Sequence, residues 1–173
     1  MIEIALQQYL TAPRDLKSPS DTQRFARPIM FGDATIETRN DARRWLRDQI
    51  GSRIYAGRNL KSEGNLALTF RRISGSQDTH LRGDDRTVAI VQADIWANGR
   101  NAFIRANYAS ECLRVAIVHY RGHWGRTEKA YVASVTVQRQ AQQMDSPNAG
   151  EQYWDFRFSA DYQINYLANQ VEV

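Results

Sequence analysis

The clearest pattern in the chain is an alternation of apolar and polar residues near its C-terminus. From position 154 to position 166, aromatic and aliphatic side chains occupy every second place, and Asp, Arg, Ser, Gln or Asn fills the places between. A period of two puts all the apolar side chains on one face of a strand. The pattern therefore predicts a long strand with one face against a core and the other toward solvent.

Three further segments are expected to be strands, at 66–74, 87–96 and 131–139. The segment 131–139 alternates cleanly, whereas 87–96 is partly apolar on both faces, which is typical of an interior strand. Between the first two lies the polar, glycine-punctuated stretch 75–86. Such a stretch favours the tip of a long hairpin.

Apolar spacing of three and four residues predicts helices over 2–10, 38–50 and 99–118. Start and stop signals support these helices. The N-cap of the second helix is predicted at Thr38 or Asn40 and its end at Gly51, and the N-cap of the third is predicted at Asn98.

The segment 13–36 has no clear period. It holds three of the four prolines and is predicted to be a long loop with a short strand near 29–31. Residues 53–55 are expected to form a short extended piece, and 119–129 a glycine-containing loop. Long loops in compact domains are usually functional or mobile.

The predicted order is helix, helix, strand, strand, helix, strand, strand. It indicates an α+β fold: an antiparallel sheet of about four strands with a long hairpin, and helices packed on one face. Residues 1–173 are the length of a single domain, with 13–36 as an inserted loop.

The excess of basic residues is concentrated in the N-terminal part of the chain. The formal net charge is +4, and the whole excess of basic residues lies in 1–61. Arginine, the dominant basic residue, is enriched at protein interfaces. The densest basic cluster is on the predicted helix 38–50, but Asp41 and Asp48 interrupt it. A solvated or protein-contacting helix face is therefore favoured over a phosphate contact.

The search for catalytic or metal-binding residues finds few candidates. The single cysteine, Cys112, excludes an internal disulfide and lies on the apolar stripe of a predicted helix, which indicates a core thiol. His119 and His123 lie in a glycine-containing loop without a third ligand, so we predict no metal and no cofactor. Asp94, on an otherwise apolar strand, needs a partner or a solvated surface.

No apolar run is long enough to span a membrane, and the N-terminus lacks the features of a signal peptide. We therefore expect a soluble protein that is made in a reducing cytoplasm.

Two groups of residues are candidates for contacts with other proteins. The polar hairpin tip cannot add to a core, so we expect it to meet a partner: Gln77, Asp78, His80, Arg82, Asp84, Asp85 and Arg86. The second group combines the helix arginines with a basic and aromatic patch: Arg43, Arg44, Arg47, Tyr120, Arg121, Trp124 and Arg126. Arg, Trp and Tyr are the residue types that dominate interface energetics, although the same patch can stack on single-stranded nucleic acid.

Several segments, taken in order, resemble the tail-completion family of long-tailed bacteriophages, which are the tail terminator or tail-to-head joining proteins of siphophage-like virions and gene-transfer particles. The similarity covers roughly 1–11 and 40–166, whereas 13–36 departs from the pattern. The segments that carry it are MIEIAL at 1–6, IGSRIYAG at 50–57, LTFRRISG at 68–75, VQADIWA at 91–97, the helix 99–118 and WDFRFSA at 154–160.

This resemblance implies a hexameric ring without enzyme activity. The ring would cap the tail tube, end tail polymerisation and present a surface to the head connector, and DNA would pass through its channel without sequence-specific binding. The implied partners are the major tail tube protein and a head-completion protein. The implied location is the virion, after assembly in the cytoplasm of a bacterial host.

Three alternatives stay open at this point. The chain can be a head-side neck or adaptor protein of the same virion. It can be a nucleic-acid-binding module, which the N-terminal charge and the patch at 120–126 would suit and a steep salt dependence would reveal. It can be a small enzyme that uses Asp94 with a histidine.

Deleting residues 77–85 tests the hairpin-tip prediction. Because a polar tip adds nothing to the core, we expect a folded protein that fails to terminate or join tails. Circular dichroism checks the fold, and the yield of infectious particles checks the function. Normal particle yield from the deletion variant would refute a role for the tip.

Overall fold

The structure is a computed structural model that describes residues 2–57, 66–78, 86–99, 101–126, 130–144 and 156–168. Strand residues outnumber helical ones. In chain order the elements are α1 (Ile2–Thr11), α2 (Pro19–Thr22), β1 (Ile29–Phe31), β2 (Ala34–Ile36), α3 (Arg39–Ile50), β3 (Ile54–Ala56), β4 (Leu66–Asp78), β5 (Arg86–Ala97), α4 (Ala102–Ile117), β6 (Gly122–Trp124), β7 (Ala130–Met144) and β8 (Phe156–Ala168).

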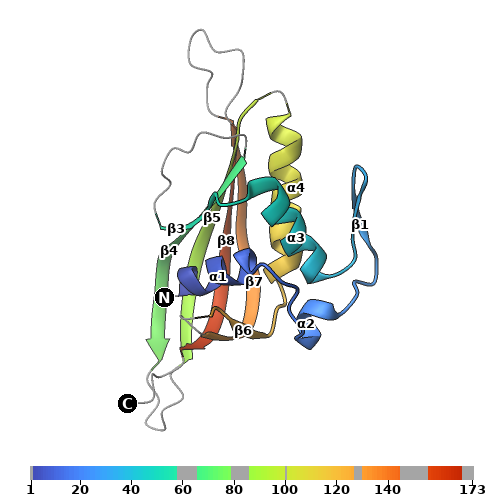
Figure 1. Cartoon of the computed structure of the whole chain (residues 1–173). Coiled ribbons are helices and arrows are strands. Elements are labelled where there is room, and N and C mark those ends of the chain that lie inside the picture. Colours follow the sequence, from blue (N-terminus) through green and yellow to red (C-terminus); the bar gives the residue numbers. More distant parts are fainter. Residues whose placement is uncertain are drawn as a thin grey trace.

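Six of the strands form one curled sheet in the order β3-β4-β5-β8-β7-β6 (Figure 1). The four long strands pair antiparallel, and β6 is antiparallel to β7, but β3 is parallel to β4. The strands β1 and β2 form a separate two-stranded ribbon.

The predicted fold class, an α+β domain on an antiparallel sheet of about four strands with helices on one face, is therefore wrong. The domain is mostly strand, and its main sheet has six strands of mixed direction. The extended piece predicted at 53–55 is found as β3, whereas β6 lies in a segment predicted to be a loop; each has three residues, too few to show a period. Parallel pairing of β3 with β4 is a tertiary feature that no local pattern encodes.

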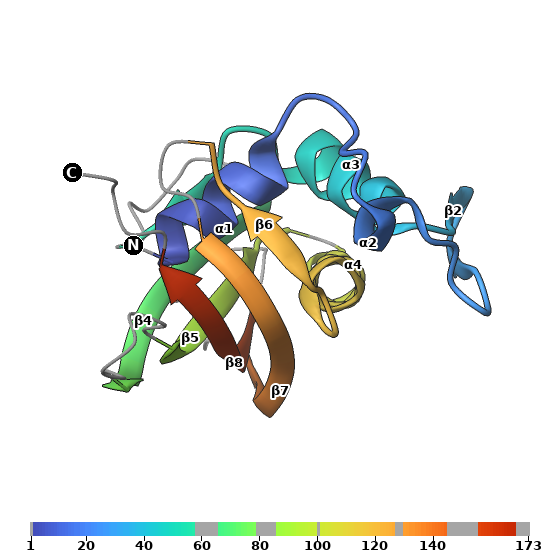
Figure 2. The same ribbon diagram turned by 90° about the horizontal axis from the view of Figure 1, so that it is seen from below.

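The core lies between the sheet and the helices. Figure 2 shows α1 and α4 beside the curled sheet, and α4 contacts β5 and β8. The apolar alternation predicted for the last strand is confirmed from 156 to 166, because its alternate residues there are all buried, whereas Trp154 lies outside the described residues. These residues are Phe156, Phe158, Ala160, Tyr162, Ile164 and Tyr166.

Local signals set the ends of α3. Thr38 caps the helix with a complete capping box, in which its hydroxyl accepts from Asp41 N–H and the Asp41 carboxylate accepts from Thr38 N–H. Gly51 ends it at φ +63°, a conformation that favours glycine. These two predictions are confirmed, but α4 begins later than predicted, with Asn101 rather than Asn98 as its N-cap.

The segment 13–36 holds α2, β1 and β2, and one buried carboxylate ties it to the rest of the molecule. Asp21 is fully buried and accepts hydrogen bonds from Tyr9 Oη at 2.8 Å and from Ser18 Oγ at 2.5 Å. The short strand predicted near 29–31 is confirmed as β1. Phe31 anchors this ribbon by stacking on Tyr108, with ring centroids 4.6 Å apart.

An aromatic cluster joins α1 to β6. The Trp124 ring lies 5.5 Å from both the Tyr9 and the Tyr120 rings, and all three side chains are buried. Burial raises the pKa of Tyr120 to about 12 and raises the pKa of Tyr9 well above its ordinary value. Both phenols therefore stay neutral at physiological pH.

Replacing Trp124 with alanine tests this cluster. Removal of a fully buried indole should lower the free energy of unfolding by about 3–5 kcal/mol, because it leaves a cavity as well as losing apolar contacts. Urea unfolding measures the change. Met30→Ala, at a side chain that is 63% exposed, is the control, and equal effects of the two changes would contradict the account.

Candidate functional site

The face of the main sheet that points away from α1 and α4 carries no helix in the described part of the chain (Figure 2). Polar side chains occupy much of it, since they alternate with the core positions of β4, β5, β8 and β7. We call this the uncovered face. Its main polar residues are Thr69, Arg71, Gln92, Asp94, Ser134, Thr136, Arg139, Arg157, Ser159, Asp161, Gln163 and Asn165.

Asp94 is the centre of an ion pair on the uncovered face. Its carboxylate is 2.9 Å from Arg157 Nη2 and accepts a hydrogen bond from Ser159 Oγ at 2.6 Å. The Arg157 guanidinium lies 4.8 Å from the ring centroid of Trp96, which covers it from one side. Asp94 thus has the partner that a buried carboxylate needs, and both of its oxygens are engaged by β8.

Cross-strand hydrogen bonds continue this network on either side. Arg71 Nε donates to Gln92 Oε1 at 2.7 Å between β4 and β5. Asn165 Nδ2 donates to Ser134 Oγ at 2.8 Å between β8 and β7. Some polar groups of the uncovered face therefore bond to one another, while Asp161 Oδ1 and Trp96 Nε1 are buried without a hydrogen-bond partner in the described part of the chain.

The predicted hairpin tip lies only partly in the described structure. Gln77 and Asp78 end β4 and pair with Thr87 and Arg86 of β5, so both strands run farther than predicted. Arg86 is exposed. His80, Arg82, Asp84 and Asp85 lie outside the described residues, and partner contact by the tip stays a prediction.

Three of the other interface candidates are inside the core, so their assignment to an interaction surface is corrected. Trp124 and Tyr120 belong to the aromatic cluster. Arg43 is fully buried, with its guanidinium 4.8 Å from the Tyr9 ring centroid, and its Nε donates to the Tyr9 carbonyl at 2.8 Å. Its Nη1 donates to Asn40 Oδ1 at 2.8 Å, so the arginine closes the end of α1 onto α3.

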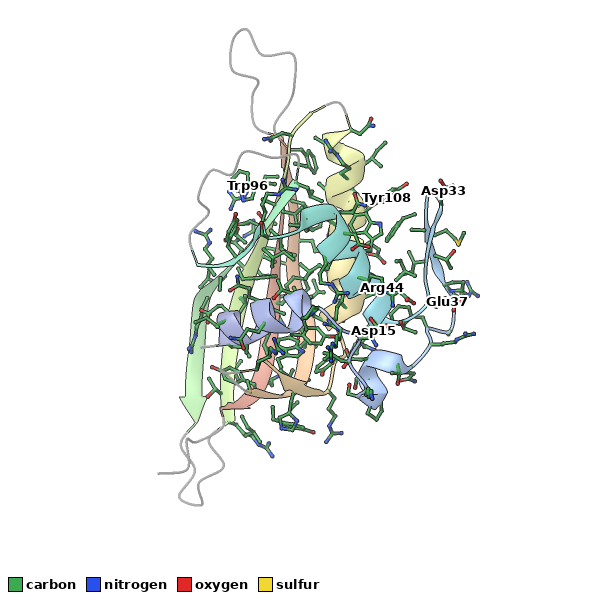
Figure 3. The ribbon with its side chains drawn as sticks, viewed as in Figure 1. Asp15, Asp33, Glu37, Arg44, Trp96 and Tyr108 are labelled. Atoms are coloured by element: carbon green, nitrogen blue, oxygen red, sulfur yellow. The ribbon has the colours of Figure 1, made fainter. Side chains whose placement is uncertain are left out.

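The remaining four candidates are partly or fully accessible, but they do not form one patch of free side chains. Arg44 pairs with Asp15 at 2.7 Å, and Arg47 donates to the Ala12 carbonyl. Figure 3 labels Arg44 and Asp15. Arg121 donates to Tyr131 Oη at 3.2 Å, and Arg126 is exposed.

The described residues hold no group of three or more His, Cys, Asp and Glu side chains that could bind a metal ion. Cys112 is buried as predicted, and burial raises the pKa of its thiol. His119, at φ +57°, donates its backbone N–H to the Val135 carbonyl at 3.0 Å, which places it at the edge of β7. None of the helices in the described part of the chain combines the length and apolar character that a membrane span requires.

Apolar side chains are exposed at three places. Met30 is on the β1–β2 ribbon, Ile73 is in β4, and Phe103 and Ile104 are adjacent on α4. Phe103 also contacts the buried Phe156 edge-on, with ring centroids 5.2 Å apart. Sequence patterning did not single these residues out as surface residues, because each lies in an element whose other apolar residues face the core.

The Asp94 ion pair gives a direct test. Asp94→Asn should lower the free energy of unfolding by about 1.5–3 kcal/mol, since it leaves the Arg157 guanidinium without its anion. Urea unfolding of the variant, of Arg157→Gln and of the double variant measures the coupling between the two side chains. Asp33→Asn, at the exposed tip of the β1–β2 ribbon, is the control. Equal stability of Asp94→Asn and the control would show that the pair contributes nothing.

Comparison with known proteins finds a likeness in fold. No protein-family model and no curated protein sequence matches the chain. Among solved structures, a chain from "Virion of native gene transfer agent (GTA) particle" superposes on it with a TM-score of 0.54 at 11% sequence identity. The match covers 71% of this chain and 84% of the other. At that identity the likeness is one of fold: this chain is built like a component of a gene transfer agent virion.

Proposed function

We propose that this protein is a structural subunit of a phage-like virion. The observation that carries the proposal is the fold likeness to a chain of a gene transfer agent particle, which extends over 71% of the present chain. Folds host many functions, so the likeness is support by analogy. The uncovered polar face and the accessible arginines suit contact with other macromolecules.

Within the virion, we assign the chain to the junction between tail and head, as a tail terminator. In this role copies of the chain form a ring, six in the related phage family, which caps the tail tube, ends its polymerisation and joins it to the head connector. At the sequence level the ordered set of segments that resembles the tail-completion family supports this assignment, and IGSRIYAG at 50–57 is one of them. It forms the end of α3 and the whole of β3, and Arg53 Nε donates to the Ile50 carbonyl at 3.1 Å.

The proposed mechanism is steric and needs no reaction. One face of the ring matches the last ring of tube subunits, and the other face offers no further tube-binding surface, so growth stops. A closed ring requires a heterologous interface whose rotation closes on itself. The protein would be part of the mature particle, and DNA would pass through the ring without being read.

The assembly state tests the proposal. Light scattering of the purified protein should show a defined multimer whose population rises with concentration, and electron microscopy should show rings. Added to polymerising tail tube protein, it should stop elongation. A chain that stays monomeric at every concentration and leaves tube length unchanged would contradict the proposal.

A further inference from the structure

The strand β4 is only half covered along the edge that faces away from β5. The strand β3 pairs with it from Leu68 to Phe70, and the Gly57 N–H bonds to the Phe70 carbonyl at 2.7 Å. From Arg71 to Asp78 no strand of the described chain pairs with that edge. The residues from 71 to 75 are all exposed.

The strand β7 is also covered over only part of its length, on its edge that faces away from β8. The strand β6 pairs with it from Ala130 to Val132, and the His119 N–H bonds to the Val135 carbonyl. From residue 136 to Met144 no strand of the described chain pairs with the edge facing away from β8. Among the described residues, the sheet therefore ends in two open edges, 71–78 of β4 and 136–144 of β7, at diagonally opposite corners.

Each open edge has the polar groups of an unpaired strand, which is a template for another strand. Both edges contain a bulge just beyond the point where cover ends, at Ile73 in β4 and at Gln138 in β7. A bulge changes the local twist and makes an edge a poor template for an arbitrary flat strand. Most of the described side chains along the edges, such as Arg72 and Gln140, are polar, and Ile73 is the exposed apolar one, so each edge can face water before assembly.

The directions of the two edges fit each other. The neighbours β4·β5, β5·β8 and β8·β7 are all antiparallel, so β4 and β7 run in opposite directions within one chain. Two copies in the same orientation would thus bring β4 of one and β7 of the other together antiparallel, continuing the alternation of the sheet.

The positions of the two open edges along the strand direction set a condition for closing a ring. Across the sheet Arg71 is level with Arg139 and Asp78 is level with Tyr131, so 71–78 lies level with 131–139 and overlaps the open part of β7 only at 136–139. A neighbouring copy must therefore be displaced along the strands by several residues before the open segments meet. Strands that tilt relative to a ring axis produce such a displacement by rotation alone, as they do in closed barrels.

We infer that copies of this chain assemble by pairing the open edge 71–78 of β4 with the open edge 136–144 of β7 in the next copy. The inference rests on the proposed function, since it names the interface that makes the ring. The interface is heterologous, and each copy uses both edges once, so the same contact closes a ring when the strands are tilted. Main-chain hydrogen bonds supply the attraction, as in other cases of strand addition.

Cross-linking tests which edges meet. One variant carries Ser74→Cys on β4 and another carries Arg139→Cys on β7, both at exposed positions on the uncovered face. The native Cys112 is buried, with its pKa raised by burial, and does not compete for a maleimide. With a short bis-maleimide, the equimolar mixture should give on the order of tenfold more cross-linked dimer than either variant alone, because pairing raises the effective concentration.

Two further variants complete the cross-linking experiment. Met30→Cys, 63% exposed on the β1–β2 ribbon, reports random collision. The double variant, with both new cysteines in one chain, should give a ladder of products that ends at the ring. Cross-linking of either variant with itself as efficiently as with the other, or no more than the Met30→Cys baseline, would overturn the inference.

A proline substitution tests the main-chain bonds. The backbone groups of Leu68 and Phe70 face β3, so those of Arg72, two residues on, face the open side. Arg72→Pro removes an outward donor and should abolish multimers in light scattering while circular dichroism stays unchanged. Arg72→Ala removes the same side chain but keeps the N–H, and it should assemble. Assembly of both folded variants would contradict the inferred pairing.

The outcomes separate this inference from the proposed function. A wild-type multimer without β4-to-β7 cross-links contradicts the edge pairing alone. A wild-type chain that is monomeric at all concentrations contradicts both the ring and the edge pairing.

Discussion

Main-chain pairing along the centre of the sheet is the interaction on which the rest of the structure depends. The strands β5 and β8 pair over their whole matched length, from Arg86 with Leu167 to Ala97 with Phe156. This ladder fixes which side chains face the helices, because a shift of one residue would turn every side chain to the other face. The strands β4 and β7 pair with β5 and β8, so the register of this ladder also fixes how far the two open edges are offset along the strands.

The two faces of the sheet around that ladder have different environments. On one face, aromatic and aliphatic side chains meet α1 and α4 and form a core that also takes in the Arg43 guanidinium and the Asp21 carboxylate. Those two buried groups hold the segment around α2 and the end of α1 in place through hydrogen bonds to Tyr9. On the other face, several polar groups bond across the strands, above all Asp94 and Arg157, whereas Asp161 Oδ1 and Trp96 Nε1 are buried without a hydrogen-bond partner among the described residues. A rigid sheet with one face left open is a suitable building block for an assembly.

Features that depend on neighbouring residues in the chain could be predicted from the sequence, whereas features that depend on tertiary contacts could not. The alternation at 154–166 predicted β8, and Thr38 and Gly51 predicted the ends of α3, because these signals lie within one element. The strands β3 and β6 are too short for a period, and the parallel partner of β3 is set by the tertiary fold. The burial of Arg43 depends on carbonyl groups of a distant helix, so its side chain looked like a surface cation. The open edges could not be predicted, since they depend on where β3 and β6 stop.

The function we propose unites these features: a chain that acts by its shape, with a core of its own and surfaces left for neighbours. The most direct test is an electron cryo-microscopy map of the intact particle that contains this protein. The account predicts a ring of copies at the junction of tail tube and head connector. A particle with an intact junction from which this chain is absent would contradict it.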